Sequence, residues 1–148
     1  MLFQMLVGVA IISTTAYIHA WALAIAIQKF EPLTRWVRAS PTHLRVSTAL
    51  GASIVWIMGA HLAEVGLWAV AFVALRIFDD LQTAYYFSLV AYTTLGFGDI
   101  ILPEKWRILS GLVAANGFLI FGWSTAFQVD FLKDLRASRL RDEATESS

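Results

Sequence analysis

The run TTLGFGD at residues 93–99 is the part of this chain whose residue types and spacing could do chemistry. Its alternating glycines, Gly96 and Gly98, allow left-handed backbone angles that other residues avoid, so successive carbonyl oxygens can all face one axis. Rings of such oxygens replace the hydration shell of a dehydrated cation. One chain supplies only one side of a ring, so the run predicts a cation site shared by four copies.

The second candidate feature is the polar pair His61 and Glu64, which interrupts an apolar stretch. The two residues are three positions apart, which puts both on one helix face. A carboxylate at membrane depth is a functional hypothesis by default, here a pH-sensitive or ion-sensitive element. The alternative, which we favour, is a structural hydrogen bond that fixes this helix to the next short helix or to the first helix. Two ligands are too few for a metal site, and three scattered histidines do not predict one.

The composition of the chain that must position these residues is typical of a membrane protein. Of the 148 residues, 58% are hydrophobic and 15% are charged, and the mean hydropathy is +0.65. Eleven basic and eleven acidic residues cancel, which gives no reason to expect nucleic acid as a partner. Cysteine is absent and no nucleophile, base and orienting residue form a set, so we expect no enzyme activity, cofactor or small-molecule substrate.

Three apolar stretches are long enough to span a membrane. Residues 1–28 contain no Asp, Glu, Lys or Arg and predict an extra N-terminal helix; a secretory signal peptide is the competing interpretation, which the missing basic segment disfavours. Residues 29–45 predict a basic cytoplasmic loop. Residues 46–75 predict an outer helix and 106–127 an inner helix, followed at 129–148 by a short cytoplasmic tail that we expect to be frayed.

The stretch 80–92 is too short to span and suits a segment that enters the membrane and returns. Asp79 or Asp80 can cap its first turn, and Gln82 follows Asp79 at the capping-box spacing. Irregular backbone at membrane depth is tolerated only where protein or a water-filled pathway surrounds it. Residues 94–98 must therefore be buried or line a pore, and their glycines favour the pore.

Basic residues predict the orientation in the membrane. The 29–45 loop and the C-terminal tail each contain four Lys or Arg, whereas the segments around the short helix contain three. Richer segments stay on the cytoplasmic side. We therefore expect the N-terminus outside and the C-terminus in the cytoplasm, with the cell inner membrane as the location.

The run TTLGFGD resembles the selectivity filter of the potassium channel family in its Gly-Phe-Gly form. The resemblance covers residues 46–128 in the order outer helix, pore helix (80–92), filter (94–98) and inner helix (106–127). It implies an all-α membrane protein with three transmembrane helices, a re-entrant pore helix and a filter loop. It also implies a fourfold assembly, a homotetramer surrounded by membrane lipid.

The resemblance also implies a role for each residue of the run. The filter would consist of Thr94, Leu95, Gly96, Phe97 and Gly98, supported by Thr93. The carbonyls of residues 94–97 and the Thr94 hydroxyl would hold K⁺. Asp99 would lie at the outer mouth, where it either raises the local cation concentration or bonds to the pore helix at Tyr86. Tyr86 and Phe87 would pack behind Phe97.

Three inner-helix residues are candidates for gating or modulation, together with His61 and Glu64. Gly117 and Gly122 fall where similar inner helices bend or pack closely, so each is either a hinge or a contact between helices. Asn116 either faces cavity water or bonds a neighbouring helix.

The expected function is passive, potassium-selective conduction by a channel subunit. One alternative is a weakly selective cation channel. Another is a non-conducting regulatory or sensor subunit that keeps the filter only as part of its fold.

Overall fold

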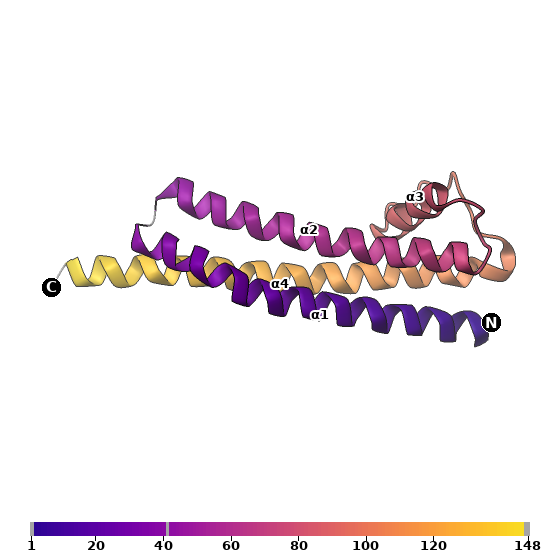
Figure 1. Cartoon of the computed structure of the whole chain (residues 1–148), viewed down its shortest axis with the longest axis horizontal. Coiled ribbons are helices and arrows are strands. Elements are labelled where there is room, and N and C mark those ends of the chain that lie inside the picture. The colour runs from indigo at the N-terminus through magenta and orange to yellow at the C-terminus, as the bar shows by residue number, and fades with distance from the viewer. Residues whose placement is uncertain (1, 41, 147–148) are drawn as a thin grey trace. The chain divides into compact units, whose positions relative to one another are not determined.

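The computed structural model describes the backbone of residues 2–40 and 42–146, with side chains as far as residue 135. Within these residues it is all-helical and contains no strand. The elements follow in the order α1 (Leu2–Ala39), α2 (His43–Ala74), α3 (Leu81–Tyr92), η1 (Glu104–Trp106) and α4 (Arg107–Glu146) (Figure 1).

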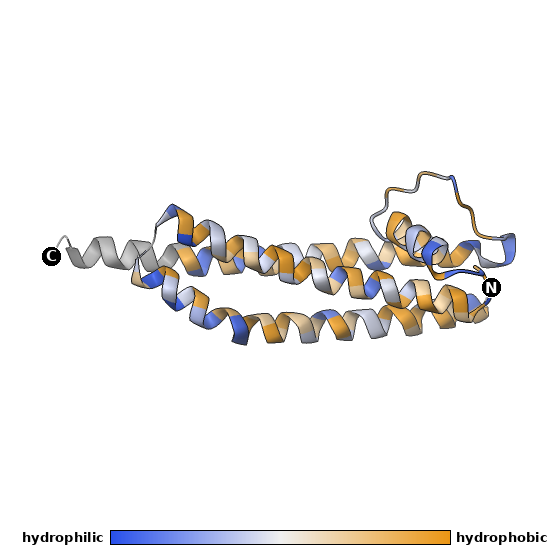
Figure 2. Cartoon of the chain, turned by 45° about the horizontal axis from the view of Figure 1, so that its top comes forward, coloured by the Kyte–Doolittle hydropathy of each residue, from blue (hydrophilic) through white to orange (hydrophobic). Residues whose placement is uncertain are grey.

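Three helical stretches are long and apolar enough to cross a membrane, which confirms the three predicted spans. They are Leu2–Ala39, His43–Ala74 and Glu104–Leu135. Figure 2 shows apolar residues along most of these helices, with hydrophilic residues gathered where α1 is followed by α2.

The predicted loop at 29–45 is wrong, because α1 continues as a helix to Ala39. The segment looks polar, but Phe30, Leu33 and Val37 recur at helical spacing. Val37 is fully buried, and Phe30 and Leu33 pack against the same small core. Burial of this apolar stripe stabilises a helix that the charges on its other face do not prevent.

The predicted frayed tail is also helical, because α4 continues to Glu146. Phe127, Phe131 and Leu135 recur every four residues on one face. Phe131 and Leu135 are buried, and the rings of Phe127 and Phe131 stack at 6.2 Å. The last two residues of the predicted tail, 147 and 148, lie outside the described residues.

The chain divides into two compact units. The first combines residues up to Ala20 with Ala60–Gly122 and contains the run at 93–99. Its core consists largely of side chains from α2, α3 and α4, with Trp68, Phe72 and Leu109 fully buried. The second combines Trp21–Gly59 with the residues from Trp123 onward and has its own smaller core.

Candidate functional site

The short helix α3 begins at a side-chain cap. Asp80 has extended backbone angles, and its carboxylate accepts a 2.8 Å hydrogen bond from the Thr83 backbone N–H. This bond lowers the pKa of Asp80 below its usual value. Of the two aspartates that the sequence offers, Asp80 is therefore the cap, and it places the start of the helix at Leu81.

Aromatic packing holds α3 in the first unit. The buried Phe87 ring meets Phe72 of α2 edge-on at 5.4 Å and lies 5.4 Å from Phe78. Phe72 in turn lies 5.9 Å from Trp68. Such ring pairs add to the stabilisation that comes from area burial alone. The helix is thus fixed at its middle as well as at its cap.

The last turn of α3 ends in a Schellman motif. The Thr94 N–H donates to the Ala91 carbonyl at 2.9 Å, and the Leu95 N–H donates to the Val90 carbonyl at 3.1 Å. In this motif the residue directly after the helix C-cap takes a left-handed conformation and is usually glycine. Here it is Thr94, with φ of 60°. The chain therefore leaves α3 through a threonine held in a conformation that costs it free energy.

Left-handed angles recur at every second residue after α3. Thr94, Gly96 and Gly98 have φ of 60°, 56° and 78°. The φ angles of Leu95 and Phe97, which lie between them, are not positive. Alternation of this kind turns successive carbonyls to one side, unlike an ordinary strand, in which they alternate. The glycines do what their spacing predicts. The left-handed Thr94 is not foreseeable from its residue type, because it is β-branched.

The run at 93–99 borders a cavity of about 340 Å³ in the first unit. Its walls come from α3, the run itself and α4, with Asp99 and Arg107 among the lining residues. The side chains of Leu95 and Phe97 are 57% and 65% exposed in the single chain. A contact of Phe97 with Tyr86 or Phe87 stays a prediction.

Asp99 bonds back to α3. The Tyr86 hydroxyl donates to Asp99 Oδ2 at 2.6 Å, and Asp99 Oδ1 accepts from the Ile100 N–H at 3.1 Å. The bond raises the pKa of the Tyr86 hydroxyl, because the phenolate form would lose it. Of the two roles considered for Asp99, the structure contains the bond to the short helix. Thr93 also bonds back, donating its hydroxyl to the Leu89 carbonyl at 2.8 Å.

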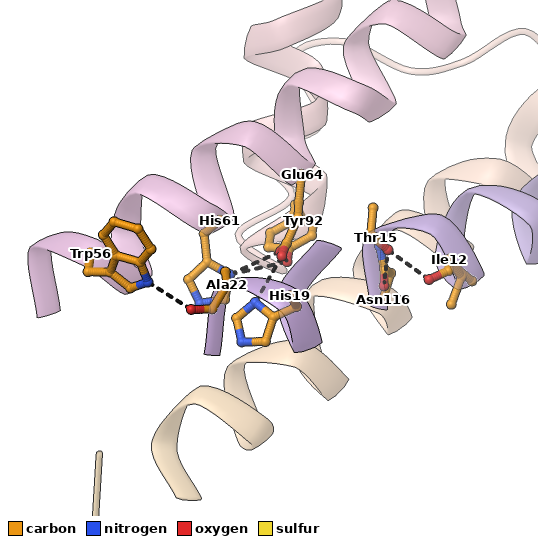
Figure 3. Close-up of polar contacts among 9 residues, drawn as sticks. All are labelled: Ile12, Thr15, His19, Ala22, Trp56, His61, Glu64, Tyr92 and Asn116. Carbon is orange, nitrogen blue, oxygen red and sulfur yellow. Dashed lines mark hydrogen bonds and ion pairs between the residues drawn. The ribbon is translucent and has the colours of Figure 1, made fainter. Parts of the chain in front are cut away.

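A buried polar cluster surrounds Glu64 (Figure 3). His19 Nδ1 of α1 lies 2.8 Å from Glu64 Oε1. The Tyr92 hydroxyl, on the last residue of α3, donates to Glu64 Oε2 at 2.5 Å. His61 Nδ1 lies 3.2 Å from that hydroxyl and 3.4 Å from Oε2. The carboxylate thus joins α2 to both the first helix and the short helix, which the sequence left as alternatives.

Asn116 of α4 bonds to α1 within the first unit. Its side-chain amide Nδ2 donates to the Thr15 hydroxyl at 2.9 Å, and Thr15 donates to the Ile12 carbonyl at 2.8 Å (Figure 3). Both side chains are buried. Of the two positions considered for Asn116, the structure therefore contains the bond to a neighbouring helix.

The two inner-helix glycines differ in their surroundings. A Cβ on Gly117 would lie 1.9 Å from the Tyr92 carbonyl oxygen, whereas a Cβ on Gly122 would meet nothing within 4 Å. Gly117 thus permits α4 to pass directly beside the C-terminal end of α3. Close packing accounts for Gly117 in this structure, and nothing among the described residues requires a glycine at 122.

Sequence reasoning missed His19, Tyr92 and Thr15. Each binds a partner at least 28 positions away, and such pairing has no local signature. One signal was present: Thr15 and His19 are polar, lie within the first apolar stretch, and are four residues apart. That spacing puts them on one helix face and marks it as the face that meets other polar groups.

The comparisons with known proteins point to one family. Residues 60–134, just over half of the chain, match a family model described as an ion channel. The match includes Glu64, all of α3, the run at 93–99 and the part of α4 that lines the cavity. Neither the curated proteins nor the solved structures gave a match.

Proposed function

Because the chain belongs to this family of ion channels, we propose that it is the subunit of a potassium-selective channel that conducts K⁺ passively through a tetrameric pore. In this proposal the irregular residues 94–98 are the selectivity filter and α3 is the pore helix. The outer and inner helices are α2 and α4.

The observation that carries the proposal is the alternation of left-handed angles at Thr94, Gly96 and Gly98. A non-glycine residue in this conformation costs about 1–2 kcal/mol, and such strain persists where the surrounding structure enforces it for a function. Carbonyls of residues 94–97 and the Thr94 hydroxyl would replace water around a dehydrated K⁺. A glycine at this Schellman position would avoid that cost, and glycine is the usual residue there.

The geometry of a filter supports the proposed fourfold assembly. One strand offers a K⁺ ion oxygens from one side only, so a closed ring needs several copies around an axis. The exposed side chains of Leu95 and Phe97 would then be covered by neighbouring copies. No cofactor is needed, because K⁺ is the permeant ion. Membrane lipid surrounds the assembly, with the C-terminus in the cytoplasm of an inner membrane.

Two groups would favour cations along the pathway. The carbonyl end of α3 is the negative end of its dipole. In the proposed tetramer it would point toward a separate, water-filled cavity on the pore axis at the membrane centre. Asp99, held by Tyr86, would place a carboxylate at the outer mouth. Both features disfavour anions and neither distinguishes K⁺ from Na⁺, so selectivity rests on the filter.

The test is ion flux into liposomes that contain the purified chain, with K⁺ and Na⁺ measured separately. Gly96→Ala puts a side chain at φ of 56°, so we expect K⁺ flux to disappear. The matched control is Gly59→Ala, because a Cβ at this helical glycine meets nothing within 4 Å, and we expect it to conduct.

Other outcomes would favour the alternatives. Equal K⁺ and Na⁺ flux would indicate a weakly selective cation channel. No flux from folded, assembled protein over a range of pH and voltage would contradict conduction by this chain alone and favour a non-conducting regulatory subunit.

A further inference from the structure

We propose that His19, His61 and Glu64 bind a divalent first-row transition metal ion such as Zn²⁺. The two histidines and the carboxylate are all buried, and one ligand atom from each lies within 4.8 Å of the others. From the sequence alone we expect no metal site, because only His61 and Glu64 count as ligands. No local sequence pattern links His19 to these two residues.

The distances suit a shared ion. Ligand atoms bound at 2.0–2.1 Å in a tetrahedral site are about 3.3 Å apart. His19 Nδ1 lies 2.8 Å from Glu64 Oε1, and His61 Nδ1 lies 3.4 Å from Glu64 Oε2. One ligand atom from each of the three residues lies within 4.8 Å of the others. The side chains would therefore have to close by up to about 1.5 Å to bind one ion at tetrahedral spacing.

The donor set favours a transition metal over Ca²⁺ or Mg²⁺. Two imidazoles and one carboxylate suit Zn²⁺ and its neighbours in the first row, whereas Ca²⁺ and Mg²⁺ prefer sites made of oxygen alone. The Tyr92 hydroxyl lies 2.5 Å from Glu64 Oε2 and 3.2 Å from His61 Nδ1. It would orient the carboxylate from outside the ligand shell or complete the tetrahedron as a fourth ligand.

A bound cation would also resolve an electrostatic cost. Glu64 is fully buried in a membrane-spanning helix, where a negative charge is expensive unless it is paired. The titratable groups that face it are His19 from α1, His61 from α2 and Tyr92 from α3. From α4 comes the apolar ring of Phe121, 4.5 Å from His61. A metal ion would place a positive charge directly beside this carboxylate.

The ion would link three helices close to the start of residues 94–98. His19 is on α1, His61 and Glu64 are on α2, and Tyr92 ends α3 two residues before Thr94. Metal binding would therefore stiffen the support beneath residues 94–98. An effect on K⁺ flux rests on the proposed function, but metal binding itself does not, and the two are tested separately.

The first experiment uses Co²⁺ as a spectroscopic probe on the wild-type protein. The full chain, free of any affinity tag, is stripped with a chelator and titrated with Co²⁺. We expect one equivalent per chain to give visible absorption bands typical of four-coordinate Co²⁺ with nitrogen ligands, and Zn²⁺ to displace them. Absence of such bands from folded protein would overturn the proposal.

Variants then assign the site. We expect His19→Gln and Glu64→Gln each to weaken Zn²⁺ binding at least about 100-fold, since even residues that only orient ligands change affinity by 10–100-fold. The matched control is His43→Gln, because His43 is an exposed histidine at the start of α2. Zn²⁺ should raise the unfolding temperature of wild type and of the control, and not of the site variants.

Two results of this series would contradict the site. One is binding that survives in both site variants. The other is binding that is lost equally in the His43→Gln control. Because the Co²⁺ spectrum is measured on unmodified protein, a variant that fails to fold does not prevent the test.

Discussion

The close passage of α4 beside α3 makes Gly117→Ala the most informative single substitution. The new Cβ would lie 1.9 Å from the Tyr92 carbonyl oxygen and 2.8 Å from its carbon, and contacts below 3.0 Å do not occur between real atoms of this kind. One helix must therefore retreat by at least about 1.1 Å. The atom in the way belongs to the backbone, so no side-chain rotation relieves the contact.

The expected loss of stability follows from two opposing effects. Overpacking costs about 1–3 kcal/mol, and a backbone obstacle puts Gly117→Ala at the upper end. Replacing a helical glycine by alanine returns about 1 kcal/mol. We expect a net destabilisation of about 2 kcal/mol for Gly117→Ala. Gly122→Ala has the same propensity gain and no contact within 4 Å, so it should be stabilising by about 1 kcal/mol.

Thermal unfolding in detergent and K⁺ flux in liposomes test this together. Gly117→Ala should unfold at a lower temperature than Gly122→Ala, and its flux should fall because the displaced Tyr92 is two residues from Thr94. The reasoning would be refuted if Gly117→Ala unfolded and conducted like wild type. An equal loss of unfolding temperature and K⁺ flux in Gly122→Ala would show that contacts outside the chain's own packing dominate.

Three further predictions concern α3 and the run that follows it. Thr94→Gly should leave the free energy of unfolding nearly unchanged, because relief of about 1–2 kcal/mol of left-handed strain is offset by the flexibility of glycine in the unfolded chain. In flux assays Thr94→Gly should lose K⁺ selectivity. The control Thr94→Ser, which keeps a hydroxyl, should keep it. Asp80 has a lowered pKa when folded, so its contribution is present above the usual value of 3.8 and lost as the pH falls through the folded value. Asp80→Asn should retain the cap and weaken this acid dependence of thermal unfolding, and an unaltered profile would count against the cap. Tyr86→Phe removes the donor to Asp99 and should make K⁺ flux decay faster under sustained conduction, with no change expected if Asp99 acts only through its charge.

The features that could be predicted from the sequence are those encoded locally. Three apolar stretches predicted the three spans, and the length of 80–92 and the capping aspartates predicted a short helix close to the observed Leu81–Tyr92. The alternating glycines predicted left-handed angles at Gly96 and Gly98. Each of these depends on composition or spacing within a few residues.

The features that were missed depend on contacts between distant segments. Pro32 and the charges near it indicated a loop, but α1 continues through the proline because Val37 is buried against other helices. The cluster around Glu64 needs His19, which lies 45 residues earlier. The role of Gly117 depends on where Tyr92 comes to lie. No local pattern contains this information.

The most direct test of the central claim is the reversal potential of the purified chain in a planar bilayer. With a tenfold K⁺ gradient balanced by Na⁺ on the opposite side, a pore that selects K⁺ should reverse near the potassium equilibrium potential, about 59 mV from zero. We predict that value for wild type. A current that reverses near zero would contradict a filter built from residues 94–98.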